Sequence, residues 1–471
     1  MTNPADTIVA VATPPGEGGV GVVRLSGPRA KEIGVALVET TSAAGARWPS
    51  HRLVYGHVVD EVTGRAVDEV LAVFMRGPHT YTAEDVFEVQ CHGGPVVLRR
   101  IVALALRQGA RLAERGEFTL RAFLNGRLDL AQAEAVLDVV KARTPGALQV
   151  AVDQLDGALS RRLSPLEDDL LGVLAFVEAS IDFVEDGIPA SDSAVLLARI
   201  DAVGGALASL RATAREGMVL RGGVRAVLAG APNVGKSSLL NALLDLDRAI
   251  VTPVAGTTRD TVEEPAVIGG LPVYLVDTAG LTPTDDPVEK LGVERSRQAI
   301  AGAGLLLLVA DLSRPLDAQD RAALSTARAL APATPAVLVL NKADLPPQLD
   351  LTTLDDLWDG RQPVAVVRCA ALTGTGLDDL RDAIAVGVLG DRGGQREDPD
   401  RVVIDNERHY RALEEAAEAL SAARDGLEAA APLDLAAGDL RAAATALGRI
   451  TGRDVGDDLL SRIFADFCIG K

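Results

Sequence analysis

A glycine-rich loop with the spacing of a phosphate-binding site lies near the middle of the chain. Residues 230–237 read Gly-Ala-Pro-Asn-Val-Gly-Lys-Ser, after an apolar run at Val224–Ala229. In such a loop, backbone N–H groups and the start of the following helix bind phosphates. Lys236 would neutralise the outer phosphates and the Ser237 hydroxyl can ligate Mg²⁺. The predicted contacts here are Asn233, Val234, Gly235, Lys236, Ser237 and Ser238.

A second motif, Asn341-Lys342-Ala343-Asp344, follows an apolar run at Ala336–Leu340. The Asp344 carboxylate can accept hydrogen bonds from N1–H and from the exocyclic amino group of guanine, whereas adenine presents an acceptor at N1. The motif therefore predicts GTP rather than ATP, with Asn341, Lys342 and Asp344 at the base.

Two further segments between these motifs are suited to the triphosphate end. In Asp277-Thr278-Ala279-Gly280 the carboxylate is placed for a contact near Mg²⁺, and the Gly280 N–H can reach the γ-phosphate. Residues 254–260 combine glycine with hydroxyl side chains, as in a switch segment whose Thr258 completes the Mg²⁺ shell. The predicted contacts are Val254, Ala255, Gly256, Thr257, Thr258, Asp277, Thr278, Ala279 and Gly280.

Leu281 stands directly after Gly280, where small Ras-like GTPases carry the glutamine that orients the attacking water. Leucine cannot orient water, so another group must assist hydrolysis alongside Lys236. Three alternatives stay open in this chain, besides a partner subunit. Arg259 is a candidate electrostatic stabiliser and Glu289 a candidate water-positioning carboxylate. The Asn233 amide oxygen could instead hold a monovalent cation beside the phosphates.

The motifs fall in the third of four segments with different patterns. Residues 1–118 combine short strand-like runs with one helical pattern, which indicates an α+β domain. Residues 119–216 and 391–471 have apolar residues at helical spacing, whereas 217–390 alternates buried strands with helices. Since an insert with neighbouring ends leaves its host intact, we expect a doubly wound α/β GTPase domain inserted into one discontinuous all-helical domain. Two separate helical bundles are the alternative.

Individual elements are also expected. The first segment should contain a helix at Val96–Arg107 and strands at Ile8–Ala12, Val20–Leu25, Leu53–Val59, Val70–Phe74 and Val86–Val89. The third segment should contain strands at Val224–Ala229, Val273–Val276, Leu305–Val309 and Ala336–Leu340.

Composition restricts where the protein works and what it binds. With 48% hydrophobic and 24% charged residues the 471-residue chain is globular, and three cysteines favour a reducing compartment, the cytoplasm. The longest apolar stretch, at 301–310, is short of the roughly 20 residues that cross a membrane. The net charge of −19 repels polyanions, so any nucleic acid must meet a local basic patch or a partner.

The whole chain resembles the family of GTPases that modify the wobble uridine of tRNA, called MnmE or TrmE. In the second half the resemblance rests on residues 230–243, 255–260, 277–281, 288–292 and the ending Phe-Cys-Ile-Gly-Lys at 467–471. In the first half it rests on residues 6–10, 13–16, 18–21, 92–95, 116–118 and 121–125. A generic GTPase would not match over this length.

The resemblance implies a tRNA modification enzyme. With a flavin- and NADH-using partner of the MnmG family, it would add a carboxymethylaminomethyl-type group at C5 of the wobble uridine of tRNA. The carbon would come from 5,10-methylene- or 5-formyl-tetrahydrofolate. The resemblance further implies a homodimer formed through the N-terminal, tetrahydrofolate-binding-like domains, a heterotetramer with the partner, and GTPase domains that meet in a K⁺-dependent way.

The resemblance also assigns ligands around the nucleotide. Glu289 matches the family's water-positioning glutamate, and Thr252 and Pro253 join the GTP contacts. Mg²⁺ would be held by Ser237 and Thr258. Potassium would be held by Asn233, Thr252, Val254 and Thr257, and it would supply the charge that an arginine finger supplies elsewhere.

For the folate, the family pattern carries over to Arg24, Glu84, Arg127 and Lys471. Two positions depart from the usual pattern. Arg127 replaces a lysine, and although both are cations their geometries differ. Ala370 replaces a serine common in guanine-binding loops, where a backbone contact can survive.

Cys468 has several interpretations. A catalytic thiol would need a lowered pKa, and a prenylation signal fits Gly470 and Lys471 poorly. We favour a family-specific tail that brings Cys468 and Lys471 near the folate, with a structural thiol next.

Two other functions remain as alternatives. One is a GTP-switch binding protein, for instance in ribosome assembly, which absence of folate binding would favour. The other is a folate-dependent aminomethyl carrier whose nucleotide domain is only regulatory.

Overall fold

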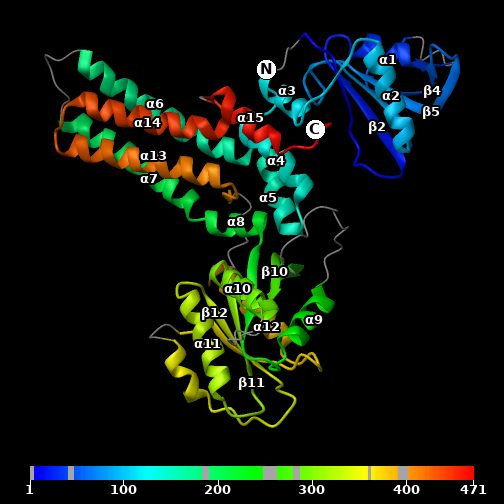
Figure 1. Ribbon diagram of the computed structural model, residues 1–471. Helices are drawn as coiled ribbons and strands as arrows, with labels where there is room; N and C mark the ends of the chain where they lie inside the picture. The colour runs from blue at the N-terminus through cyan, green and yellow to red at the C-terminus, as the bar shows by residue number, and fades with distance from the viewer. Residues whose placement is uncertain are drawn as a thin grey trace. The chain divides into compact units, whose positions relative to one another are not determined.

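The computed structural model describes residues 5–40, 47–182, 190–247, 263–278, 287–358, 362–390, 401–453 and 455–471 (Figure 1). The chain divides into two compact units. Unit 1 joins both ends of the chain, Met1–Leu137 and Leu440–Lys471, with Gln154–Leu174. Unit 2 contains Asp138–Asp153 and Ala175–Asp439. These limits do not coincide with the expected boundaries at 118, 216 and 390, which stay predictions.

Unit 1 contains a seven-stranded sheet in the order β3-β4-β5-β6-β2-β1-β7. Neighbouring strands pair antiparallel except β1 and β7, which are parallel. The bounds are β1 Ile8–Val11, β2 Gly18–Ser26, β3 Val38–Glu39, β4 Arg52–Asp60, β5 Arg65–Met75, β6 Val86–Gly93 and β7 Arg111–Leu112. All five strands expected from the sequence are confirmed.

Two helices, α1 (Ala30–Leu37) and α2 (Pro95–Arg107), pack against the sheet of unit 1. Their apolar faces bury Ile33 and Ile101 against Phe87 and its neighbours. A Cβ on Gly34 of α1 would lie 2.2 Å from the Phe87 ring, so glycine permits this close helix–sheet contact. The helix expected at 96–107 is confirmed, whereas α1 was not predicted because its single short stretch gives a weak periodic signal.

Helices complete unit 1 around a second apolar core. Residues from α3 (Glu117–Leu124), α4 (Leu130–Lys141) and α15 (Asp457–Ala465) meet there, and the Phe464 and Phe467 rings lie 5.2 Å apart. Helices α6 (Ala158–Asp182) and α14 (Leu433–Thr451) each have one end in unit 1. Beyond α15, the C-terminal tail forms an isolated antiparallel β-bridge between Ile469 and Arg115, which lies between β7 and α3.

Unit 2 contains a six-stranded sheet in the order β13-β12-β11-β8-β10-β9. All neighbours are parallel except β9 and β10. The bounds are β8 Val224–Ala229, β9 Glu263–Ile268, β10 Leu271–Asp277, β11 Leu305–Asp311, β12 Ala336–Asn341 and β13 Ala365–Arg368. The four expected strands are confirmed. The edge strands β9 and β13 were missed because they are short and only partly apolar.

Both faces of this sheet are covered by helices, which explains its continuous apolar strands. Leu228 and Leu307 point to the face with α9 (Lys236–Asp247) and α12 (Leu377–Leu389). Val227 and Leu308, one residue away, point to the face with α10 (Pro287–Ala301) and α11 (Ala318–Leu330). A 3-10 helix, η1, spans Leu351–Leu357. The expected doubly wound α/β architecture is present.

Within unit 2, helices that precede the α/β sheet in the sequence pack against a helix and a segment that follow it. In α7 (Ala190–Arg211) and α13 (Glu407–Glu428), Arg211 pairs with Glu414 at 3.1 Å and Arg424 with Asp201 at 2.7 Å. Next to them, α8 (Ala214–Gly222) contacts residues 401–404: the Ile404 N–H donates to Thr213 Oγ1 at 3.0 Å. Helix α5 spans Pro145–Leu155.

One helical stretch among the described residues, Ser193–Gly222, has the length and mean hydropathy (1.5) of a membrane-crossing helix. A single stretch of this kind is weak support for a membrane, because a core helix passes the same test. One side of α7 is buried within unit 2, including Leu196, Ile200 and Leu207.

A glycine in α8 allows the two flanking segments to meet, and this gives a stability prediction. A Cβ on Gly217 would lie 2.2 Å from the Ile404 carbonyl oxygen, a backbone atom that cannot rotate away. Overpacking costs about 1–3 kcal/mol, against a gain of up to about 1 kcal/mol from better helix propensity. We expect Gly217→Ala to lower the free energy of unfolding by about 1–2 kcal/mol, measured by chemical denaturation.

Gly205→Ala is the matched control, because Gly205 also lies in a helix of unit 2 and a Cβ there meets nothing within 4 Å. It should stabilise the protein slightly. A Gly217→Ala variant as stable as the control would contradict the close packing of α8 on the 401–404 segment.

Candidate functional site

The phosphate-type loop of unit 2 joins the buried strand β8 to helix α9. Two glycines are needed for its path. A Cβ on Gly230 would lie 2.3 Å from the Val309 carbonyl oxygen of β11, and one on Gly235 would lie 2.3 Å from Asn341 Nδ2. Gly235 and Asn233 both have positive φ, 95° and 63°. Backbone N–H groups are thereby gathered at the N-terminus of α9, as anion binding requires.

Lys236 is held beneath this loop. Its Nζ donates to the carbonyl oxygens of Gly230 at 3.1 Å and Ala231 at 2.9 Å. Burial lowers the pKa of Lys236, and the nearby Asp277 carboxylate partly offsets this shift. A buried ammonium bound by neutral carbonyls lacks a full counter-charge, so the site favours an added anion next to it.

Ser237 and Asp277 bring hard oxygen ligands together at the end of β10. The Ser237 hydroxyl donates to Asp277 Oδ2 at 2.5 Å. Within the described part of the chain, the other carboxylate oxygen, Asp277 Oδ1, is buried without a hydrogen-bond partner. Mg²⁺ takes such oxygens in preference to nitrogen or sulfur, so these two residues fit a magnesium site next to the phosphates. Thr278, directly after β10, donates a hydrogen bond from its hydroxyl to the Leu228 carbonyl of β8 at 2.7 Å.

Asn341 connects the phosphate-type loop to the other side of the site. Its Nδ2 donates to the Val234 carbonyl at 2.9 Å, and its Oδ1 accepts from the Ala371 N–H at 3.1 Å. Lys342 Nζ pairs with Asp311 Oδ2 at 2.6 Å. The Asp344 side chain is exposed and available to a ligand. The structure thus brings the first and last predicted motifs together at one edge of the sheet.

Several predicted site residues lie outside the described part of the chain. These are Thr252, Pro253, Val254, Ala255, Gly256, Thr257, Thr258, Arg259, Ala279, Gly280 and Leu281. Glu289 lies in helix α10, but its side chain is outside the described part of the structure. The predicted switch, potassium and water-positioning contacts therefore stay predictions. Ser237 and Ser238 are both exposed at the start of α9.

The four predicted folate residues lie in unit 1, and two of them, Arg24 and Arg127, contact Tyr81. The guanidinium carbons of Arg24 and Arg127 lie 5.4 Å and 5.1 Å from the Tyr81 ring centroid, as in cation–π pairs. Arg24 also pairs with Glu88 at 2.6 Å. A third residue, Glu84, follows Tyr81 by three positions in the same loop. The group offers cations for an anionic ligand and a carboxylate for a hydrogen-bond donor.

The C-terminal tail brings Lys471 to this group. A Cβ on Gly470 would lie 2.2 Å from the Val11 carbonyl oxygen, so glycine is needed where the tail touches β1. The pKa of Lys471 is lowered first by burial and then by the positive charge of Arg24, while Cys468 opposes the shift. Arg24 and Lys471 thus repel each other, and an anion bound between them would relieve this repulsion.

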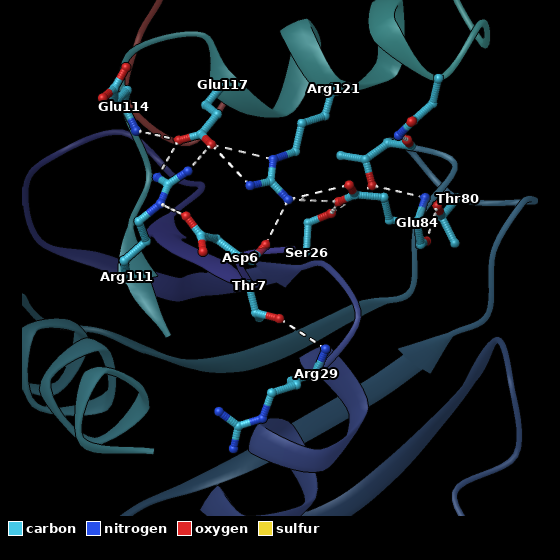
Figure 2. Close-up of polar contacts among 12 residues, drawn as sticks. Asp6, Thr7, Ser26, Arg29, Thr80, Glu84, Arg111, Glu114, Glu117 and Arg121 are labelled. Atoms are coloured by element: carbon cyan, nitrogen blue, oxygen red, sulfur yellow. Dashed lines mark hydrogen bonds and ion pairs between the residues drawn. The ribbon is translucent and has the colours of Figure 1, made fainter. Parts of the chain in front are cut away.

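A buried charge network lies beside Glu84 (Figure 2). Glu117 receives Arg111 at 2.6 Å and Arg121 at 3.1 Å, and Arg121 also reaches Glu84 at 3.1 Å. Burial alone would raise the pKa of Glu117. The hydrogen bonds from Arg111 and the Glu114 N–H and the two guanidinium charges outweigh burial, so the pKa of Glu117 is held below its ordinary value.

The cysteines differ in environment. Cys468 is exposed on the tail, whereas Cys91 and Cys369 are buried. Burial, helped by the charge of Asp68, raises the pKa of Cys91 to about 11, and burial raises that of Cys369 to about 12. Neither buried thiol is suited to act as a thiolate.

Sequence reasoning missed Tyr81, Arg121 and Asp311 as site residues. Tyr81 and Arg121 touch predicted folate residues, and Asp311 holds Lys342. A signal existed for Arg121, which falls in the 121–125 motif, but only the fold shows what that motif contacts. Asp311 ends a buried strand, a position from which a carboxylate reaches the carboxyl edge of a parallel sheet.

Comparison with known proteins covers the whole chain. Residues 7–127 match the family model described as the GTP-binding protein TrmE N-terminus, and residues 130–468 match that of the MnmE helical domain. A solved structure, the G domain of the T. maritima FeoB iron transporter, is 26% identical over 35% of this chain and 98% of that chain. Its TM-score of 0.27 is too low to support a structural argument.

Full-length relatives are much more similar. A protein of Chloroflexus aurantiacus is 48% identical over 99% of this chain and 100% of its own length. One of Levilactobacillus brevis is 45% identical over 100% of this chain and 99% of its own. One of Roseiflexus castenholzii is 49% identical over 99% of both chains. All three are named tRNA modification GTPase MnmE. With both family models matched and full-length identity far above 30%, the chain belongs to the MnmE family.

Proposed function

We propose that this protein is a GTP-hydrolysing tRNA modification enzyme. The observation that carries the proposal is the joint arrangement of Lys236, the Ser237–Asp277 pair and Asn341 around one loop, in a chain whose full-length relatives are named tRNA modification GTPases. With a flavin- and NADH-using partner of the MnmG family, it adds a carboxymethylaminomethyl-type group at C5 of the wobble uridine.

The geometry of unit 2 supports GTP binding. The loop N–H groups and Lys236 face the phosphates, while Asn341 keeps the loop joined to the segment that carries Asp344. Asp344 then accepts from the guanine N1–H and amino group. Ser237 and Thr258 would hold Mg²⁺ near Asp277, and the ion would supply charge stabilisation at the phosphates.

Hydrolysis needs a substitute for the missing glutamine. Asn233 is exposed and has a positive φ on the loop beside Gly235 and Lys236. Together with Thr252, Val254 and Thr257 it would hold K⁺, which supplies positive charge that an arginine finger supplies elsewhere. Glu289 positions the attacking water, and Arg259 remains a candidate stabiliser.

The folate proposal rests on the donor set of unit 1. Arg24, Arg127 and Lys471 offer three cations, which suits the carboxylates of a tetrahydrofolate such as its 5,10-methylene or 5-formyl form. Glu84 offers a carboxylate to the N–H groups of the pterin ring. Arg127 contacts Tyr81 through its guanidinium group, which lies over the ring, and through a hydrogen bond to the Tyr81 carbonyl at 2.9 Å. An arginine is thereby held in this group at the position where the resemblance implies a lysine.

We further infer that residues 217–390 form a GTPase domain inserted into a discontinuous helical domain of 119–216 and 391–471, after an N-terminal domain of 1–118. The pairing of α7 with α13 and of α8 with residues 401–404 supports this arrangement. The protein would act in the cytoplasm as a homodimer and as a heterotetramer with its partner. At a net charge of −19, tRNA would be bound largely through local basic surface or the partner.

The alternative of a GTP-switch binding protein without modification chemistry would leave the grouping of Arg24, Glu84, Arg127 and Lys471 without a role. Stability alone does not explain a tail that brings a half-buried lysine near an arginine, because like charges repel. The grouping therefore favours the modification enzyme.

The central test is the modification reaction itself. We expect the protein with its flavin-dependent partner, tetrahydrofolate derivative, GTP and undermodified tRNA to yield modified wobble uridine, detected by mass spectrometry of nucleosides. Lys236→Ala should abolish it by removing the phosphate counter-charge, whereas Lys141→Ala, an exposed lysine, should not. Unaltered modification by Lys236→Ala would instead favour the folate carrier with a regulatory nucleotide domain.

A second prediction concerns the cation. Steady-state GTP hydrolysis in matched KCl and NaCl should be faster in K⁺ by on the order of tenfold or more, because the ion replaces a missing charge at the transition state. Asn233→Ala should reduce this difference. Equal rates in both salts would remove Asn233 from the site and bring Arg259 or a partner protein forward.

A third prediction concerns Glu289. Glu289→Ala should lower kcat for GTP by about 100-fold while changing GTP affinity by less than about threefold, because water positioning acts mainly in the transition state. Glu294→Ala is the matched control, an exposed glutamate of the same helix. A large loss of affinity with normal turnover would assign Glu289 to ground-state binding.

A further inference from the structure

Helix α3 and the turn after it hold the loop that carries Glu84. Asn125 Nδ2 donates to the Thr82 carbonyl at 2.7 Å, and Arg127 Nη1 donates to the Tyr81 carbonyl at 2.9 Å. The Tyr81 hydroxyl also shares a hydrogen bond with Thr119 at 2.8 Å. Helix α3 and the turn after it therefore hold Tyr81 and Thr82 of this loop from one side.

Arg121 is the one residue of α3 that reaches the Glu84 side chain itself (Figure 2). Its Nη1 lies 3.3 Å from Glu84 Oε1 and 3.1 Å from Oε2, and it also donates to the Asp6 carbonyl at 3.0 Å. Nε and Nη2 of the same guanidinium both donate to Glu117 Oε1. Only 3% of the Arg121 side chain is exposed, so it does not offer itself to a ligand.

Glu84 is fixed on its other side by a closed ring of hydrogen bonds. Ser26 Oγ donates to Glu84 Oε2 at 2.7 Å and lies 2.7 Å from Thr82 Oγ1, which accepts from the Glu84 N–H at 3.3 Å. Since Ser26 has one hydroxyl proton and gives it to the carboxylate, Thr82 must donate to Ser26. The ring and the guanidinium together leave the carboxylate a single orientation.

The charge arrangement requires an arginine. A guanidinium presents several N–H groups in one rigid plane, so it can bridge two carboxylates and a carbonyl at once, whereas an ammonium is a compact point charge. Glu117 is itself secured by Arg111, Asp6 receives Arg111 at 2.9 Å, and Glu117 also accepts from the Glu114 N–H. Arg121 is therefore held in place by Glu117, and its Nη1 group can orient the Glu84 carboxylate.

We propose that Arg121 is a positioning residue for the folate: it orients the Glu84 carboxylate toward the paired N–H groups of a 2-amino-4-oxo pterin ring without touching the ligand. This inference rests on the proposed function, in which Glu84 is a folate contact. It assigns a role to the 121–125 motif, with Asn125 as a second support of the same loop.

A double-mutant cycle on the full-length protein tests the inference. We would measure the Kd of 5-formyl-tetrahydrofolate by isothermal titration calorimetry for wild type, Glu84→Gln, Arg121→Lys and the double variant. Each single change should weaken binding by about tenfold, and the double variant should bind no more weakly than Glu84→Gln alone, since the two residues act through one contact. A purely structural role would give additive losses.

A second pair of variants keeps the test valid if Arg121→Lys folds poorly. Asn125→Ala removes one amide-to-carbonyl hydrogen bond from the loop, and we expect a Kd increase of about three- to tenfold. Gln132→Ala is the control, because it removes a bond of the same kind, from Nε2 to the Leu155 carbonyl at 2.9 Å, together with one from the Asp129 N–H at 3.0 Å. Thermal unfolding of both variants checks that they are equally folded.

The outcomes separate the two proposals. Folate binding by wild type with a loss in Glu84→Gln, but wild-type affinity in Arg121→Lys and Asn125→Ala, would overturn the positioning role alone. Additive losses in the double variant would overturn it as well. No folate binding by wild type would overturn the folate part of the proposed function and the inference with it.

Discussion

The nucleotide site depends on how closely the backbone after β8 can approach the ends of strands β11 and β12. Gly230 lies against the Val309 carbonyl of β11 and Gly235 against the Asn341 amide of β12, at distances that admit no side chain. This packing turns the chain sharply from strand to helix and directs N–H groups at one point. Lys236, Ser237 and Asn341 are placed by that turn, so their chemistry follows from a steric constraint.

In unit 1, by contrast, the main constraint is that charged side chains are buried and must each be paired in a defined geometry. The side chains of Arg121 and Glu117 are buried, and that of Arg111 is partly buried. Each of the three charged groups lies within hydrogen-bond distance of an opposite charge. Burying charges is costly unless geometry is good, and breaking one partner leaves another unpaired. Such a network adds little net stability, but it fixes the orientation of its side chains. Through Arg121 it also restricts the Glu84 carboxylate, which lies in the loop that contains Tyr81. The tail then adds Lys471 to the same group.

How far sequence reasoning reached depended on the range of the interactions involved. The phosphate-type loop, its guanine partner motif and the long apolar strands were found because each is a local pattern of a few residues. Short α1 and the edge strands β9 and β13 were missed because their patterns are brief and their burial comes from neighbours. The predicted folate residues came only from the resemblance, because Arg24, Glu84, Arg127 and Lys471 are scattered along the chain and no local spacing links them.

The sequence by itself therefore determined the kind of nucleotide chemistry, the α/β and helical segments, and the family. Those features follow from backbone propensities and motif spacing, which act over a few residues. Only the tertiary structure decided that Gly470 of the tail packs against the Val11 carbonyl, that Asp311 pairs with Lys342, and that Arg121 reaches Glu84. These contacts join residues up to several hundred positions apart, and they form only when apolar burial brings the strands and helices that carry them into contact.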